Sequence, residues 1–277
     1  MVALLLACAR APSDADVAAA TLTAEDAGEV RAYTEGKDRW LGATLPIRSL
    51  TSLDAYAEGD TVFLSGLSHQ LVPSALAEWF PQLFVVVLES TDLRTWSAHA
   101  WPVDAPGHSL IDPALVLGPT GRELWFVQVD GTGDPAQGSR PSQVVRTHWT
   151  GSGFGRAEVM VEGKGLVDPS PVYQGEAWEV FLTRDHHEVV ATSGAGLVSV
   201  VAGLTVPHVR REGDTVLLTA QRVEAGRAQA VELRRTDGGG WSAPIPIELA
   251  DGGVCSSPSS ARTGATRVLF CAEERGR

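Results

Sequence analysis

A short phrase recurs along this 277-residue chain and constrains its fold more than any other feature. In each copy an apolar lead reaches an aspartate, and a strand-like run follows after a short gap. The three aspartates are Asp54, Asp112 and Asp168. Their spacing is nearly even, because Asp54 and Asp112 are 58 positions apart and Asp112 and Asp168 are 56 apart. Self-similarity at a fixed period predicts an array of structural repeats, each one supersecondary unit.

The other apolar segments are short, rich in β-branched residues and bounded by glycine or proline, which predicts strands. Helical periodicity is scarce, and only residues 74–79 are compatible with one short helix or an inserted loop. Four repeats begin near residues 45, 106, 163 and 206. A fifth holds only two strands, over 256–262 and 267–272, before the chain ends. Residues 29–33 and 40–43, at the other end of the chain, supply the missing pair.

This count of strands per repeat predicts an all-β fold, a five-bladed β-propeller in which both termini contribute strands to the closing blade. Such closure removes the open sheet edges that invite aggregation. Residues 28–277 form the propeller, and residues 1–27 form a signal and tether segment. A β-sandwich, or two small ones, is the competing architecture. A single evenly spaced series of about twenty strands argues against it.

The net charge of the chain limits the kinds of partner that can be expected. The formal net charge is −12, and an acidic surface repels phosphate backbones, so nucleic acid is not an expected partner.

The N-terminus carries a different signal. The run Leu5-Leu6-Ala7-Cys8 resembles a bacterial lipobox, which makes Cys8 the expected lipidation site, although the basic residues that usually precede it are missing. The alternative is a frayed apolar end. The apolar run is too short to span a bilayer, so the membrane is expected as a partner only through this anchor. The protein is therefore expected outside the cytoplasm, in the cell envelope or the extracellular medium. In such a compartment Cys255 and Cys271 are either a disulfide or two buried thiols, and the sequence leaves both open.

The repeated aspartates predict chemistry at the axis of the propeller. The innermost strand of each blade lines an axial channel, so three carboxyl groups at strand starts crowd into one opening. Like charges at short range push their pKa values apart, which yields a proton donor and a proton acceptor. Glycoside hydrolysis uses that pair. The alternative is that an aspartate before proline, as in Asp112-Pro113, caps a local turn.

Two phrases resemble the five-bladed propeller glycosidases, above all glycoside hydrolase family 43 and its arabinanase, xylosidase and invertase relatives. One is Ser90-Thr91-Asp92-Leu93-Arg94-Thr95-Trp96, similar to a phrase that ends the first blade in that family. The other is Ile111-Asp112-Pro113, similar to the start of its second blade. The resemblance implies that Asp54 is the general base, Asp112 modulates the pKa of the acid, and Asp168 is the acid. The family has glutamate where this chain has Asp168, and the side chain is one methylene shorter here.

The phrase that contains Asp92 also resembles the Asp-box of sialidases. A sialidase needs an arginine triad and a tyrosine nucleophile, and no arginine leads a repeat in this sequence. We therefore interpret Asp92 as a turn carboxylate and Trp96 as a ring packed between blades.

Three further residues are candidates for substrate binding: Trp79, because sugars stack on aromatic rings, His108 near Asp112, and His208 at the head of the fourth repeat. Trp125 and Trp178 lie within strand patterns and are expected in the core. No metal ligand set has a recognisable spacing, and no cofactor is predicted. Related propellers hold an axial cation near a channel histidine, whereas a lone histidine is more often a hydrogen-bonded core residue.

The sequence thus favours a glycosidase-like propeller that acts on a glycan by inverting, carboxylate-based hydrolysis. The alternatives are a non-catalytic propeller of the cell envelope that binds a glycan or a protein, and a scaffold without a small-molecule site.

Overall fold

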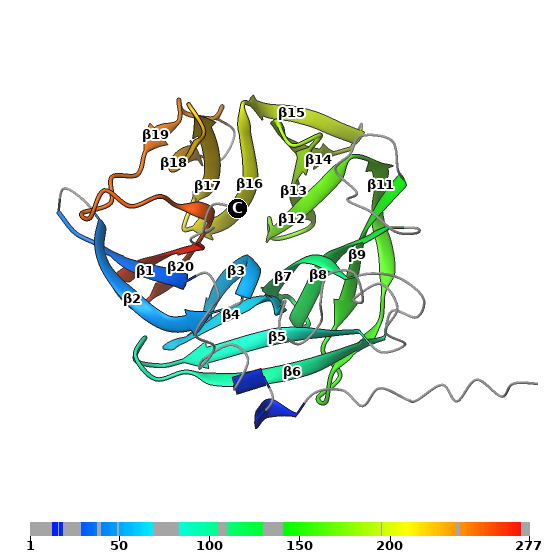
Figure 1. The fold of residues 1–277 in the computed structure, drawn as a ribbon. Coiled ribbons are helices and arrows are strands. Elements are labelled where there is room, and N and C mark those ends of the chain that lie inside the picture. The colour runs from blue at the N-terminus through cyan, green and yellow to red at the C-terminus, as the bar shows by residue number, and fades with distance from the viewer. Residues whose placement is uncertain are drawn as a thin grey trace, which may run out of the picture.

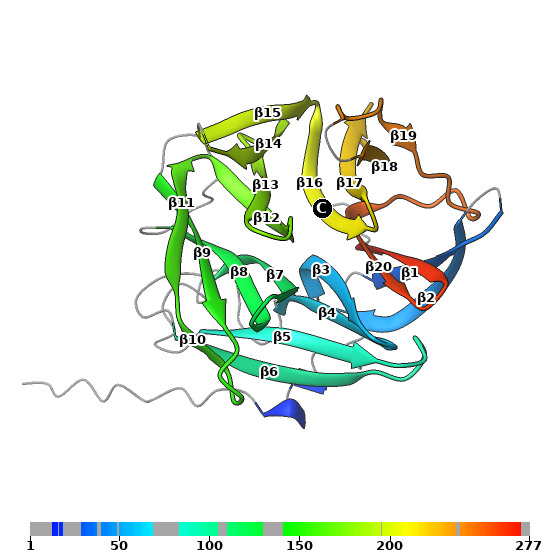
Figure 2. The ribbon, with the colours of Figure 1, turned by 180° about the vertical axis from the view of Figure 1, so that it is seen from behind.

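The computed structural model describes residues 13–15, 17–18, 29–37, 40–48, 50–68, 83–104, 110–129, 141–194, 196–236 and 239–272. Within them, five sheets stand like blades around a common axis (Figure 1). The same ring is seen from behind in Figure 2. The predicted all-β, five-bladed propeller is confirmed. In the described part of the chain no helix is long and apolar enough to cross a membrane.

Each blade is an antiparallel sheet whose strands follow one another from the axis outward. Blade 1 consists of β3 (Leu50–Glu58), β4 (Thr61–Ser68), β5 (Leu83–Ser90), β6 (Ser97–Asp104) and the short β10 (Phe154–Arg156), which pairs with β6 in parallel. Blade 2 consists of β7 (Ile111–Gly118), β8 (Gly121–Val129), β9 (Pro141–His148) and β11 (Glu158–Lys164). Blade 3 consists of β12 (Leu166–Tyr173), β13 (Trp178–Arg184), β14 (Glu188–Ser193) and β15 (Gly196–Ala202). Blade 4 consists of β16 (Leu204–Glu212), β17 (Thr215–Glu224), β18 (Arg227–Thr236) and β19 (Ile245–Pro246).

Blade 5 joins the two ends of the chain. Its order is β20 (Ser256–Thr263), β21 (Thr266–Ala272), β1 (Glu29–Glu35) and β2 (Trp40–Arg48). Strands β1 and β21 pair in antiparallel register, with Val30 opposite Ala272, as the strand count predicted. A disulfide joins Cys255 to Cys271, one of the two states that the sequence left open.

The recurring phrase lies on the innermost strand of each of the first three blades, which is β3, β7 or β12. Asp112 and Asp168 are near the starts of their strands. The run that follows is the second strand. The inner strands are therefore the segments that bring the phrase residues to the axis (Figure 1).

The core lies between the blades. The five clusters of buried apolar side chains among the described residues each bridge two neighbouring blades. Trp96 of blade 1, for example, packs edge-on against Phe270 of blade 5. Because each sheet buries both faces in this way, the strands are apolar on both sides rather than alternating. Residues 13–15 and 17–18 also contact blade 1: Val17 is buried in one of these clusters, and Asp14 contacts His99. This part of the expected tether is thus packed on the propeller.

Candidate functional site

Every inner strand contains a β-bulge near its start. In each one a residue has a left-handed backbone, with φ between 46° and 51°: Ser52, Asp112, Asp168, Val206 and Ser257. A bulge leaves its extra residue unpaired and turns its side chain away from the ladder. All five residues are half-buried. We call this layer the rim.

The rim corrects the register expected from the sequence. Asp112 and Asp168 occupy equivalent positions, as predicted, but the equivalent residue of blade 1 is Ser52. Asp54 lies two residues further along its strand. Its counterparts are Ala114, Ser170, His208 and Ser259. The three aspartates are therefore not in one register, and the rim holds a serine hydroxyl where the resemblance implies the general base.

The rim residues of the first three blades contact one another through Asp112. Its Oδ1 accepts a hydrogen bond from the Ser52 hydroxyl at 2.8 Å, and its Oδ2 accepts one from the backbone N–H of Asp168 at 3.3 Å. Asp112 and Asp168 thus come from neighbouring blades to one place on the axis, as expected. These contacts hold the Asp112 carboxylate in a fixed orientation.

The next layer is a ring of hydrogen bonds between blades. In each of these bonds the acceptor is the side chain two residues after the rim residue. The donor is a backbone N–H of the inner strand in the next blade, three residues after the rim residue of that strand. Asp54 Oδ2 accepts from Leu115 (3.1 Å), Ser170 Oγ from Val209 (2.7 Å), His208 Nδ1 from Ser260 (3.3 Å) and Ser259 Oγ from Ala55 (2.6 Å). All four acceptor side chains are buried, so each bond satisfies a buried N–H that would otherwise be unpaired.

The fifth junction, between blades 2 and 3, lacks this bond for a reason that the sequence makes plain. Its equivalent residues are Ala114 and Pro171. The alanine methyl group cannot accept a hydrogen bond, and proline has no N–H to donate. The sequence therefore omits the donor and the acceptor together.

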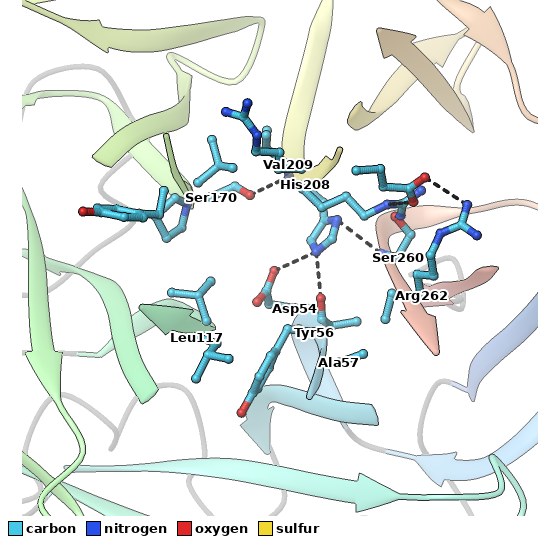
Figure 3. A pocket seen from close by; sticks show the side chains of 18 of the residues that line it. Asp54, Tyr56, Ala57, Leu117, Ser170, His208, Val209, Ser260 and Arg262 are labelled. Atoms are coloured by element: carbon cyan, nitrogen blue, oxygen red, sulfur yellow. Dashed lines mark hydrogen bonds and ion pairs between the residues drawn. The ribbon is translucent and has the colours of Figure 1, made fainter. Parts of the chain in front are cut away.

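Asp54 and His208 meet inside this ring (Figure 3). His208 Nδ1 accepts a hydrogen bond, so Nε2 carries the proton; it lies 2.9 Å from the Ala55 carbonyl oxygen and 3.3 Å from Asp54 Oδ1. Burial, reinforced by the charge of Arg210, lowers the pKa of His208 to about 3. Burial also raises the pKa of Asp54 well above its usual value, against the opposing hydrogen bond from Leu115. With this lowered pKa the imidazole of His208 is uncharged near neutral pH, so the contact is a hydrogen bond and not an ion pair.

The axial cation of related propellers does not fit this histidine. Both ring nitrogens of His208 are engaged with backbone groups, and a metal ligand needs a free lone pair. Among the described residues, no three of His, Cys, Asp and Glu come together to bind a metal ion.

A pocket of about 670 Å³ lies beyond the ring, towards the turns that join the first and second strands of the blades. Its floor contains Asp54, Ser170, His208 and Ser260, and every lining residue on an inner strand follows the rim in sequence. Around it stand Tyr56, Tyr173, Trp178, Arg210, Arg211, Glu212 and Arg262. Figure 3 shows the labelled side chains around this central space.

Most of these pocket residues were not predicted from the sequence. Asp54 and His208 were, but Trp178 was expected in the core, whereas it both packs against the core and lines the pocket. Trp125 is fully buried, as expected. Their position was an available indication, because the arginines and tyrosines follow the rim residue of their inner strand by four or five residues. Trp79, His108 and Cys8 lie outside the described residues.

The phrase that contains Asp92 is a structural turn, as interpreted. Oδ1 of Asp92 accepts hydrogen bonds from the backbone N–H groups of Thr95 and Arg94, both at 2.8 Å. These bonds lower the pKa of Asp92 to about 2. Trp96 is 8% exposed and packs between blades 1 and 5. Neither residue faces the axial pocket.

No family model and no curated protein matches the chain. Solved structures do. An α-L-arabinofuranosidase from Lactobacillus brevis has a TM-score of 0.59 at 8% identity, over 81% of this chain and 84% of that one. The catalytic domain of a GH62 α-L-arabinofuranosidase from Coprinopsis cinerea has a TM-score of 0.55 at 12% identity, over 88% and 97%. An exo-β-1,3-galactanase from Phanerochaete chrysosporium, with β-1,3-galactotriose, has a TM-score of 0.51 at 14% identity, over 82% and 61%. At such identities the likeness concerns the fold. The chain has the five-bladed propeller fold of family 43 and family 62 glycoside hydrolases.

Proposed function

We propose that the protein is a glycan-binding propeller that has the glycosidase fold and binds its glycan at the rim without hydrolysing it. One observation carries this proposal: Ser52, and not a carboxylate, occupies the rim position of blade 1, and its hydroxyl is bonded to Asp112. Inverting hydrolysis needs a general base that activates water opposite the acid. A serine hydroxyl that donates to a carboxylate does not supply that base.

The position of Asp54 supports the same proposal. Its side chain is buried, its Oδ2 accepts the Leu115 N–H, and burial raises its pKa. A general base has to be ionised and within reach of the water that it activates. A buried carboxyl group that is held in the inter-blade ring, and whose protonated form is favoured by burial, has a structural role instead.

Glycan binding follows from the chemistry that remains at the rim. Two half-buried carboxyl groups and a hydroxyl can receive hydrogen bonds from sugar hydroxyl groups. Sites of this kind combine a few placed polar groups with a concave surface. The galactanase with a similar fold was solved with a bound oligosaccharide.

The experiment is a glycan array followed by calorimetry, in parallel with turnover of a panel of aryl-glycosides. We expect binding to a subset of glycans, weakened about tenfold or more in Asp112→Asn and Asp168→Asn, and no turnover. Asp60→Asn, in the exposed β3–β4 turn, removes the same charge elsewhere and should bind like the wild type. Absence of any bound glycan would overturn the proposal.

Hydrolysis at the rim is the second candidate, because two residues with carboxyl groups, Asp112 and Asp168, hold equivalent rim positions in neighbouring blades. A pair is the minimum that glycoside hydrolysis needs. Turnover of an aryl-glycoside by the wild type that is lost in Asp168→Asn would favour hydrolysis over binding alone. Turnover that persists in both rim variants would exclude the rim as its site.

We further propose that the protein is exported to the cell envelope and anchored through Cys8. The disulfide between Cys255 and Cys271 supports an oxidising compartment. Metabolic labelling with a fatty acid tests the anchor: label should appear in the wild-type protein and not in Cys8→Ser. A protein that is found only in the cytoplasm, with both thiols reduced, would contradict export.

A further inference from the structure

The axial pocket beyond the hydrogen-bonded ring is not used by the proposed function. The rim lies at the start of the inner strands, whereas the pocket lies where those strands turn back at Gly213 and its equivalents. The ring with Asp54 and His208 separates the two. A ligand in this pocket would therefore occupy a second site, at the other end of the axis from Asp112 and Asp168.

The pocket is positively charged in an acidic protein. Its charged lining residues are Arg210, Arg211 and Arg262, against Glu212 and the buried Asp54. Three positive charges and at most two negative charges leave a net positive charge, although the chain as a whole carries −12. Such local reversal raises the concentration of anions at one opening.

Glu212 fixes two of the arginines but neutralises only one charge. Its Oε1 accepts a hydrogen bond from Arg210 Nε at 2.8 Å, and its Oε2 accepts one from Arg262 Nη2 at 2.9 Å. Nη1 of Arg210 donates to the Ser260 hydroxyl. Nη2 of Arg210 is buried and has no hydrogen-bond partner among the described residues. Burial and the nearby Arg267 lower the pKa of Arg210, so positive charge here is poorly compensated.

Arg211 and Arg262 hold exposed positions at the mouth. Arg211 is oriented by Nε, which donates to the Gly213 carbonyl oxygen at 2.9 Å, and by a bond to Gln174. Guanidinium groups fixed in this way match the planar, two-oxygen geometry of a carboxylate better than a lysine would.

The rest of the lining fits a sugar ring. Tyr56, Tyr173 and Trp178 are half-buried around the pocket, and aromatic faces take the apolar faces of sugars. Hydroxyl groups of the ligand can bond to Ser170 and to the Asp54 carboxyl group at the floor. The volume of about 670 Å³ lies within the range of about 300–1,000 Å³ that is typical of small-molecule sites.

We propose that this pocket binds a saccharide that carries a carboxylate, a hexuronic acid or a short oligosaccharide with one at its end. The arginines at the mouth hold the carboxylate, and the aromatic side chains hold the ring. This site is independent of the glycan site at the rim.

The test uses glucuronate and galacturonate, with glucose and galactose as neutral counterparts of the same shape and phosphate as a plain anion. Binding is followed by ligand-observed NMR and by the tryptophan fluorescence to which Trp178 contributes. We expect the uronates to bind about tenfold or more tightly than the hexoses, and Arg211→Gln and Arg262→Gln each to weaken uronate binding by about tenfold. Arg94→Gln, an exposed arginine of the Asp92 turn, removes the same charge and should change nothing.

Three results would overturn the proposal: no uronate binding by the wild type, equal binding of hexoses and uronates, or displacement of uronate by an equal concentration of phosphate. Uronate binding that both pocket variants leave intact would overturn it as well. Asp168→Asn separates the two sites, because it should weaken glycan binding at the rim and leave uronate binding unchanged. Circular dichroism of each variant shows that a loss of binding is not a loss of fold.

Discussion

Oδ2 of Asp54 accepts a 3.1 Å hydrogen bond from the backbone N–H of Leu115. The aspartate that opens the repeated phrase therefore links blade 1 to blade 2. Ser52 takes the rim position instead and donates to Asp112. In this chain one of the three carboxyl groups has a structural role inside the propeller, while the other two, those of Asp112 and Asp168, are half-buried at the rim.

The pH dependence of stability tests the buried state of Asp54. Because burial raises its pKa in the folded protein, the unfolded chain releases its proton first as the pH rises from about 4. The unfolded state then binds fewer protons than the folded state, so stability falls with rising pH. We expect the free energy of unfolding of wild type, relative to Asp54→Asn, to decrease in urea titrations as the pH rises above about 4.

Asp92 is a control, because its contribution to stability should change with pH in the opposite direction. Hydrogen bonds from Thr95 and Arg94 lower the pKa of Asp92 to about 2, so its contribution to stability is present above the unfolded pKa and is lost as the pH falls towards 2. Asp92→Asn should therefore approach wild-type stability in acid. A stability difference between wild type and Asp54→Asn that does not change with pH would contradict a raised pKa of Asp54 in the folded protein.

The inter-blade ring predicts the cost of losing one member. Ser259 is fully buried, and its hydroxyl accepts the Ala55 N–H at 2.6 Å. Ser259→Ala leaves that buried N–H unpaired, which costs about 1–3 kcal/mol of unfolding free energy. Urea denaturation measures the change. Ser257→Ala, at the half-buried rim position of the same strand, should cost less than about 0.5 kcal/mol. Equal losses of unfolding free energy in the two variants would show that the hydrogen bond of Ser259 does not add to stability.

The fold could be predicted from the sequence because the same pattern of strands recurs in each of the five blades. Strand-like runs, their spacing and the unpaired strands at the two ends predicted the closing blade, where β1 pairs with β21. The pairing of Cys255 with Cys271 was not predictable, since neighbouring strands permit a bridge without requiring it.

The register at the axis was harder to predict. An alignment on aspartate matches Asp54 to Asp112, but the bulge is marked by the residue that follows the rim, which is proline in four blades: Pro113, Pro169, Pro207 and Pro258. Aligning on that position places Leu53 with the prolines and Ser52 with Asp112. Position on the inner strand was the one indication of the pocket arginines, because Arg210 and Arg262 come together only where two blades meet at Glu212.

The disulfide makes a prediction for blade 5. The bond joins residues 16 positions apart, Cys255 and Cys271, both buried. A loop of about this length is worth about 3 kcal/mol through the entropy of the unfolded chain. Cys255→Ser, or reduction, should lower the unfolding free energy by about 2–4 kcal/mol in denaturant titrations. Cys8→Ser is the matched control. Its unfolding free energy should equal that of the wild type, both without reductant and with it. Insensitivity of the wild type to reductant would argue against the bond.

The junction between blades 2 and 3 allows a test of how the ring of hydrogen bonds between blades depends on its donor and acceptor residues. Ala114→Ser adds an acceptor that Pro171 cannot use, and Pro171→Ala adds a donor that Ala114 cannot use, so each single variant buries an unpaired polar group and costs about 1–3 kcal/mol. Together they complete the fifth bond. A double-mutant cycle should therefore show favourable coupling of about 0.5–1.5 kcal/mol in unfolding free energy. Pairing Ala114→Ser with Pro207→Ala, whose nitrogen directly follows the rim of blade 4 and is not a donor position of the ring, should give coupling near zero. Additive losses in both cycles would mean that the match of Ala114 with Pro171 is accidental.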